Sequence, residues 1–268
     1  MLDDNVPQPW QGRTTLVFAL AAAAIGVGNI FRFPYLLGEH GGAPFFIAYA
    51  ATLLLVVVPV LVAEVMLGSH GRGSPLGAMR WAADQSGRWV SWSWLGTVQA
   101  LIGLLLAVEM VQVAAWFVDR AELLHDGQMA AASAADMANN FAALTNNHPR
   151  MWLLMGGLLI AAGTLSALGI QVAMLVIGWL VLPAMSVAML GLLDYSLNEG
   201  DLKLAGEFLF ARQYDRFNFA GVMAGMTSAL CTMAAGVGVG LCFGARTPRD
   251  VSLLRSVAAA SLLDTAFA

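Results

Sequence analysis

Charged side chains are scarce in this sequence. Only 11% of its 268 residues are Asp, Glu, Lys or Arg, whereas 59% are hydrophobic. A soluble domain carries about 25% charged residues, so the composition predicts that most of the surface faces lipid. The net charge of -4 gives no basic surface of the kind that binds nucleic acid. We therefore expect a membrane protein with no nucleic-acid partner.

Cysteine is almost absent, and the common catalytic motifs are missing. Cys231 and Cys242 lie in one apolar stretch, which excludes a disulfide framework and a cysteine metal site. Both are expected to act as small hydrophobic side chains. There is no HExxH, no GxSxG and no pair of nucleophile and base on a polar segment, so we expect no enzyme and no catalytic residues. The acidic N-terminus, residues 1–4, is unlike a cleavable signal peptide.

Long apolar runs are what the sequence does contain. A helix needs about 20 apolar residues to cross a bilayer. We predict an all-α, polytopic helical membrane protein with one transmembrane domain over residues 1–268. Its six complete spans and partial seventh are expected at residues 14–37, 43–67, 92–118, 151–168, 171–193, 217–243 and 251–268.

Arginines in two loops set the expected orientation, because basic loops stay in the cytoplasm. The loop after the second segment carries Arg72, Arg80 and Arg88, and the loop after the sixth carries Arg246 and Arg249. The intervening loops are acidic and are expected outside. This arrangement predicts a multi-pass protein of the cell (inner) membrane with a cytoplasmic N-terminus.

The first apolar segment contains residues that break helices. Gly26, Gly28, Asn29, Arg32 and Pro34 fall within nine positions. Glycine costs a helix about 1 kcal/mol relative to alanine, and proline removes a backbone hydrogen bond. Irregular backbone inside a membrane survives only where it is buried in protein or lines a cavity. We favour a broken helix whose free backbone groups face a ligand over a simple proline kink.

The sixth segment repeats this pattern after Thr232, with Gly236, Gly238 and Gly240 at two-residue spacing. Gly240 and Gly244 also fit close packing between helices, which is the alternative explanation. Interrupted first and sixth helices are typical of transporters built from inverted repeats. In such proteins, half-helix N-termini hold an anionic group, and unwound carbonyls hold a cation such as sodium.

Ionisable residues inside the apolar segments are functional candidates, because each costs at least about 2.5 kcal/mol near a helix centre. Arg32 and Asp264 are the strongest candidates. Glu64 has a structural alternative, a pairing with backbone amides beside a broken helix. Glu109 could face a cavity, and Asp194 sits near a helix end.

The motif Gly26-x-Gly28-Asn29-x-x-Arg32-Phe33-Pro34, followed by Glu39-x-Gly41-Gly42-Ala43-x-Phe45, then Pro59 and Glu64, resembles that of the neurotransmitter:sodium symporter family, bacterial type. Thr232 with Gly236 and Gly238 is similar to the sixth helix of that family, and Asp264-Thr265 to its seventh. The resemblance implies a LeuT-like fold, of which this chain would be the N-terminal portion: the first inverted repeat, the broken sixth helix and the start of the seventh.

The resemblance also implies roles for individual residues. Sodium would be bound by the following residues: Ala22, Ala24, Ile25, Asn29, Thr232 and Asp264. Asp264 stands where the family often has Asn, and Arg32 would form an external gate. The substrate would contact the following residues: Ala23, Ala24, Val27, Gly28, Leu106, Met110, Cys231, Thr232, Ala234 and Val237.

Several of these positions depart from the family pattern. Ala23 replaces an Asn, and Met110 replaces a tyrosine whose hydroxyl would reach a substrate carboxylate; a thioether cannot donate a hydrogen bond. Val237 replaces an aromatic lid, and Cys231 a larger side chain. Gly26 stands where amine transporters have an aspartate, which favours an amino-acid-like substrate over a monoamine.

The resemblance implies sodium-coupled symport of an amino acid or similar small solute, with sodium as the co-transported ion and no indication for or against chloride. The second inverted repeat of the family has no counterpart in these residues. We therefore expect an incomplete N-terminal part that needs a C-terminal half or self-association. The alternative is a non-transporting relative that acts as a membrane scaffold or partner subunit.

Overall fold

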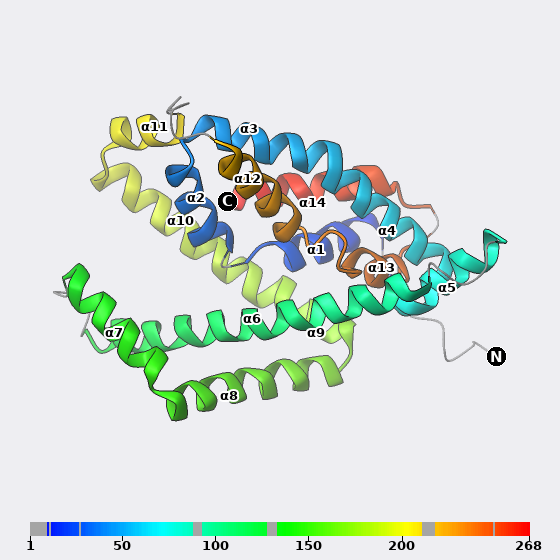
Figure 1. Ribbon diagram of the computed structural model, residues 1–268, viewed down its shortest axis with the longest axis horizontal. Coiled ribbons are helices and arrows are strands. Elements are labelled where there is room, and N and C mark those ends of the chain that lie inside the picture. The colour runs from blue at the N-terminus through cyan, green and yellow to red at the C-terminus, as the bar shows by residue number, and fades with distance from the viewer. Residues whose placement is uncertain are drawn as a thin grey trace. The chain divides into compact units, whose positions relative to one another are not determined.

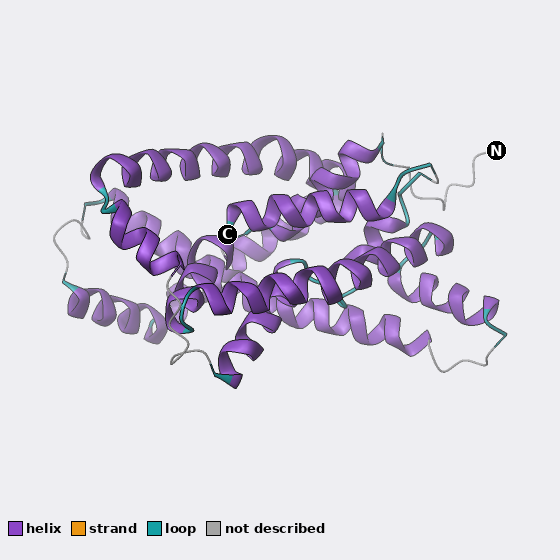
Figure 2. Ribbon diagram, turned by 90° about the horizontal axis from the view of Figure 1, so that it is seen from above, coloured by secondary structure: helices purple, strands orange, loops and turns teal. Residues whose placement is uncertain are grey.

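The computed structural model describes residues 10, 12–26, 28–87, 93–127, 133–210, 218–248 and 250–268. Within these residues all regular elements are helical and no strand occurs (Figure 2). They form two compact units, residues 1–100 with 176–268 and residues 101–175. Figure 1 shows the elements of both units, whose relative placement is not determined.

Four helices of the described residues are long and apolar enough to span a membrane, at Ala43–Gly71, Ser93–His125, His148–Ala167 and Val172–Glu199. A fifth span is formed if Arg13–Ala24 and Gly28–Glu39 are counted together across their bend of 58°. The all-helical class and the membrane character predicted from composition are therefore confirmed.

The first span is broken where the glycines predicted a break. Helix α1 (Arg13–Ala24) ends at Ile25, whose backbone is extended. The chain resumes in a π-helical turn, η1 (Gly28–Arg32), followed by α2 (Phe33–Glu39). Pro34 lies in the first turn of α2, which continues directly from η1. The break therefore lies before Gly28, at the glycines, and not at the proline.

The second span is continuous and consists of α3 (Ala43–Thr52), the π-helical turn η2 (Leu53–Val57) and α4 (Val58–Gly71). Arg72 follows α4 in the left-handed conformation and ends the helix. Helix α5 (Pro75–Gln85) begins at Ser74, whose hydroxyl accepts a hydrogen bond from the Gly77 N–H at 3.2 Å. The long α6 (Ser93–His125) follows.

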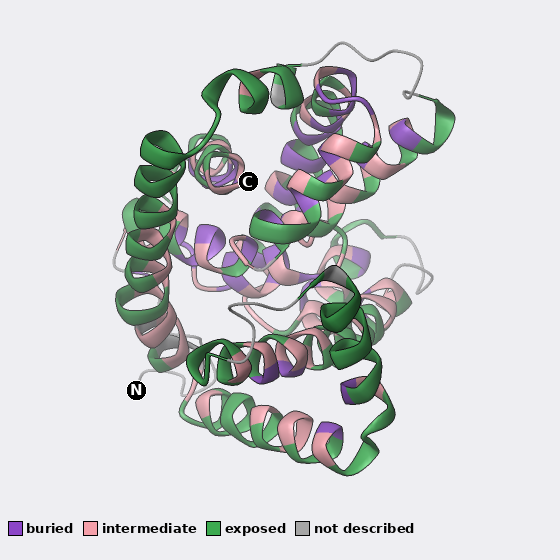
Figure 3. Ribbon diagram, turned by 90° about the vertical axis from the view of Figure 1, so that its left-hand side faces the viewer, coloured by how far each residue is buried: buried purple, intermediate pink, exposed green. Residues whose placement is uncertain are grey.

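A further continuous stretch consists of α9 (Ile170–Val176), the π-helical turn η3 (Ile177–Val181) and α10 (Leu182–Glu199). The short α11 (Leu202–Phe210) follows. Most residues of α10 are exposed, as expected for a helix solvated by lipid. Figure 3 shows that exposed residues cover long stretches of the helices.

The sixth segment is also broken. Helix α12 (Phe219–Thr232) ends in a run of turns, and the chain becomes helical again only in α13 (Val239–Gly244). Between them Ala234, Gly236 and Gly238 have φ values of 47°, 86° and 86°. Glycine adopts such values without strain, which explains why glycines were needed here. The last helix is α14 (Leu253–Phe267).

Helices α13 and α4 pack closely because glycines lie at their contact. A Cβ on Gly68 would lie 2.2 Å from the Leu241 carbonyl oxygen, and one on Gly244 would lie 2.2 Å from that of Val65. The small-residue packing pattern expected of Gly240 and Gly244 is therefore confirmed, together with the break. Helix α13 thus packs against α4, and in a separate contact α14 packs against α1. Buried residues of the first unit come from both broken helices, among them Ala24 and Leu241.

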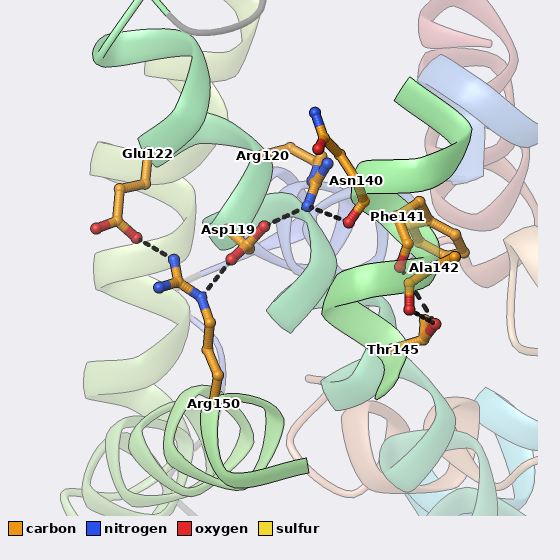
Figure 4. A network of polar contacts seen from close by, with 8 residues as sticks. All are labelled: Asp119, Arg120, Glu122, Asn140, Phe141, Ala142, Thr145 and Arg150. Atoms are coloured by element: carbon orange, nitrogen blue, oxygen red, sulfur yellow. Dashed lines mark hydrogen bonds and ion pairs between the residues drawn. The ribbon is translucent and has the colours of Figure 1, made fainter. Parts of the chain in front are cut away.

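The second unit has its own small core and a network of ion pairs. It contains the part of α6 from residue 101, α7 (Ala134–Asn146) and α8 (His148–Ala167). Figure 4 shows the buried carboxylate of Asp119 between Arg120 at 2.5 Å and Arg150 at 2.6 Å, while Arg150 also reaches Glu122 at 2.7 Å. The buried residues of this unit's core are Ala115, Leu144 and Met151.

Candidate functional site

Three polar side chains meet where the two broken helices pass α14. The Asn29 amide nitrogen donates to Asp264 Oδ1 at 2.7 Å and to the Asp264 carbonyl oxygen at 3.2 Å. The Thr232 hydroxyl lies 3.0 Å and 2.9 Å from the two carboxylate oxygens of Asp264. Residues from η1, the end of α12 and α14, more than 200 positions apart at the extremes, therefore converge on one carboxylate.

The break also leaves backbone oxygens of α1 without hydrogen-bond donors. Because α1 ends at Ala24, the carbonyls of its last turn lack the donors that a continuing helix would provide. The N–H of Gly26, which would otherwise bond to Ala22, instead donates to Asn29 Oδ1 at 3.1 Å. The asparagine side chain thus holds the break open and connects it to Asp264.

The carboxylate of Asp264 is buried without a countercharge. Its residue is 0% exposed and Asn29 is 4% exposed, and no Lys, Arg or His of the described residues pairs with either. An ionised carboxylate away from water is costly unless a positive charge compensates it. A cluster of carboxylate, hydroxyl and carbonyl oxygens around one negative charge can provide that compensation by binding a hard monovalent cation.

Tyr49 of α3 belongs to the same region and was missed by the sequence reasoning. Its hydroxyl lies 3.4 Å from the Thr265 hydroxyl, next to Asp264 in the chain, and the residue is 1% exposed. A tyrosine in the middle of an apolar span was the available signal, because a buried hydroxyl needs a polar partner.

The other residues expected around the first break lie where the resemblance placed them. Ala22, Ala23 and Ala24 form the last turn of α1, and Ile25 and Gly28 flank the break. Ala24 is buried, whereas Ala23 and Gly28 are exposed. Val27 lies outside the described residues. The assignment of these residues to sodium or substrate stays a prediction.

Around the second break, Cys231 is exposed, Thr232 is half-buried, and Ala234 and Val237 lie in the turns between α12 and α13. Arg32 ends η1 with an exposed side chain. Leu106 and Met110 lie on the part of α6 that belongs to the second unit, whose position relative to the first is not determined. Their expected contact with the substrate therefore stays a prediction.

Glu64 of α4 lies beside the second break. Its Oε1 accepts hydrogen bonds from the Gly238 N–H at 3.3 Å and from the Gln99 amide at 3.1 Å. The structural reading of Glu64, a pairing with a backbone amide beside a broken helix, is thereby confirmed. Sequence reasoning missed Gln99 for the same reason as Tyr49: it is polar but uncharged.

The sequence model described as the sodium:neurotransmitter symporter family matches residues 8–118, the region that contains the first break and Glu64. Residues 8–118 are thus similar to the sodium:neurotransmitter symporter family. This is a family of transporters and not of enzymes, in agreement with the motifs that the sequence lacks.

Relatives align either with nearly the whole chain at low sequence identity or with a shorter part at higher identity. The uncharacterized sodium-dependent transporter YhdH of Bacillus subtilis is 22% identical over 98% of this chain and 57% of its own length. The sodium- and chloride-dependent GABA transporter 2 of Macaca fascicularis is 33% identical over 40% of this chain and 17% of its own length.

The fold is similar to that of MhsT in a crystal structure with L-phenylalanine, with a TM-score of 0.81 and 24% identity. That match covers 97% of this chain and 58% of the MhsT chain, and it confirms the LeuT-like fold. The chain thus spans just over half the length of YhdH and of MhsT.

Proposed function

We propose that this chain binds sodium and a small, amino-acid-like solute at the paired breaks of α1 and α12, as part of a sodium-coupled symporter. The observation that supports the proposal is the buried Asp264 carboxylate, held by Asn29 and Thr232 without a countercharge. The relatives named as sodium-dependent transporters supply the identity of the cation.

Each protein group has a distinct task in this proposal. Asp264 provides the negative charge, Asn29 Oδ1 and the Thr232 hydroxyl provide neutral oxygens, and the carbonyls of Ala22, Ala24 and Ile25 complete the cation shells. The ends of the half-helices would orient the solute, since the N-terminal end of a helix favours an anionic group. Arg32 would gate access from the external side. The chain would lie in the cell (inner) membrane with its N-terminus in the cytoplasm.

Transport requires more than binding. Alternating access in this fold moves one repeat against the other around a fixed site, and this chain spans just over half the length of YhdH. We propose that the remaining helices come from further polypeptide, a separate chain or a second copy. The second candidate function, a non-transporting subunit, is favoured by Ala23 and Met110, which offer no polar group to a substrate.

A sodium titration of thermal stability tests cation binding. Sodium should raise the melting temperature of the purified chain, and potassium at equal ionic strength should not. A ligand at a hundred times its Kd stabilises by about 2.7 kcal/mol. Asn29→Ala should remove the sodium effect, whereas Asn139→Ala, an exposed asparagine on α7, should keep it. An equal response of wild type to both ions would reject the proposal.

The exposed thiol of Cys231 tests solute binding, because it lies at the end of α12 beside Thr232. In a Cys242→Ala background, alkylation of Cys231 should slow when sodium and the correct amino acid are both present. Monoamines should give no protection, since Gly26 offers them no carboxylate. Uptake by the chain alone in liposomes would exclude the non-transporting alternative; sodium binding without solute protection would favour it.

A further inference from the structure

Glu64 is a buried acid that the sodium site does not use. It is 6% exposed, and no Lys, Arg or His among the described residues forms an ion pair with it. Other ionisable groups on the elements packed around α4 are the following: Cys242 on α13 and Arg246 after it, Arg80 and Asp84 on α5, and Arg255 and Asp264 on α14. An isolated buried carboxylate is costly, and such groups tend to become neutral.

The hydrogen bonds of this carboxyl group are unevenly distributed. Oε1 accepts from both Gln99 and Gly238. Oε2 is buried and makes no hydrogen bond that meets the usual distance and angle limits, although the N–H groups of Gly236 and Gly240 also lie near the carboxyl group. The side-chain oxygen of Gln99 is likewise buried without a partner. The two unsatisfied acceptors therefore belong to two side chains that are already hydrogen-bonded to each other.

One added proton would give both unsatisfied oxygens a hydrogen-bond partner. An ionised carboxylate can only accept, as can the amide oxygen of Gln99, so neither can satisfy the other. With a proton on Oε2, Glu64 donates to the Gln99 oxygen while Oε1 continues to accept from the Gln99 nitrogen. Exchanging the oxygen and nitrogen of the Gln99 amide only moves the required proton to the other carboxyl oxygen.

A metal cation fits this position less well than a proton. A Cβ on Gly240 would lie 2.6 Å from Glu64 Cβ and 2.8 Å from Oε2, so the α13 backbone already lies against the free oxygen. The Leu61 side chain closes the same space, with its Cδ1 3.0 Å from that Cβ position. The backbone and Leu61 thus occupy the space that an ion with its ligand shell would need.

We propose that Glu64 is a proton-binding site, in which the neutral carboxyl group and the Gln99 amide form a reciprocal pair that holds the turns 233–238 in place. The proton comes from bulk water and returns to it, and no other bond is made or broken. Its release would leave a buried charge with one oxygen unsatisfied, so the turns must shift or admit water. Proton binding is thereby linked to the shape of the second break, independently of sodium.

Infrared difference spectroscopy on the full chain in lipid discs tests this proposal. A protonated carboxyl group has a C=O band that ionised carboxylates lack. With sodium present to compensate Asp264, we expect one such band at neutral pH. It should be lost on raising the pH, absent in Glu64→Gln and shifted in Gln99→Leu. Glu207→Gln, a control on the exposed surface of α11, should retain it.

Stability gives a second measurement. Glu64→Gln preserves a donor and an acceptor for Gln99, so it should match the wild-type melting temperature at neutral pH and remove the fall at higher pH. Glu64→Leu should be less stable at every pH. A missing band at neutral pH in a folded protein, or a Glu64→Gln variant as unstable as Glu64→Leu, would overturn the proposal. Loss of the sodium response with the band intact would reject only the sodium site.

Discussion

At the scale of single residues, Asp264 is the group that decides the chemistry. Its carboxylate receives hydrogen bonds from side chains on two other elements and is fully buried. The sequence identified Asp264, Asn29 and Thr232 through the family motif, and the structure brings all three together. It could not identify Tyr49 or Gln99, because a neutral polar residue in an apolar helix becomes informative only when its partner is known.

Replacing Asp264 separates its charge from its hydrogen bonds. Asp264→Asn keeps an acceptor oxygen, so it should fold and bind sodium more weakly. Asp264→Ala removes the carboxylate that accepts from the buried Asn29 amide and from the half-buried Thr232 hydroxyl. Loss of an acceptor costs a buried donor about 1–3 kcal/mol, so Asp264→Ala should be the less stable variant. Denaturation of both variants without sodium measures this difference. Equal stability of the two variants would show that these hydrogen bonds do not support the fold.

At the scale of elements, the sequence predicted the breaks in the first and sixth segments. It predicted the packing of helices around them only in part. Gly26, Gly28 and Pro34 are poor helix residues whatever the tertiary structure, so their effect is visible in the sequence. The contact of Gly68 with Leu241 joins residues far apart in the chain, and no local pattern contains that pairing. The carbonyl directions at the end of α1 likewise depend on the observed backbone.

Adding one methyl group to the α4–α13 contact should be destabilising. A Cβ on Gly244 would lie 2.2 Å from the Val65 carbonyl oxygen, which is backbone and cannot move away freely. Overpacking of this kind costs about 1–3 kcal/mol, so Gly244→Ala should lower the melting temperature. Gly156→Ala on α8 is the control, since nothing lies within 4 Å of its Cβ position. No difference between the two variants would contradict the close approach.

The helix α7 begins with a pH-sensitive cap outside the candidate membrane spans. The Asp136 carboxylate accepts hydrogen bonds from the Ser133 hydroxyl at 2.7 Å and from the Ser133 N–H at 3.0 Å. These hydrogen bonds lower the pKa of Asp136. A lowered folded-state pKa stabilises above the unfolded pKa, and this contribution is lost as pH falls through the folded value.

Hydrogen exchange of the first α7 amides should therefore accelerate as the solution is acidified through the range in which Asp136 takes up a proton. Ser133→Ala should give fast exchange already at neutral pH, because both halves of the capping box depend on this residue. Asp126→Asn, outside α7, should leave the profile unchanged. A pH-independent exchange rate in the wild type would contradict the role of the cap.

At the scale of the whole molecule, the chain combines a site-bearing unit with a second helical unit stabilised by ion pairs. All described residues of the proposed sodium site lie in the first unit, whereas Leu106 and Met110 lie in the second. Composition was enough to predict the helical membrane class. The division into two units follows from long-range contacts that composition does not contain.

Direct binding of radioactive sodium to the purified chain tests the central claim, that the break at Gly26 and Asp264 together form a cation site. Wild type and Asn139→Ala should bind sodium saturably, with competition by unlabelled sodium and none by potassium. Asn29→Ala should not bind above background. Saturable binding that survives Asn29→Ala and Asp264→Ala together, or no binding by a folded wild-type chain, would contradict the account.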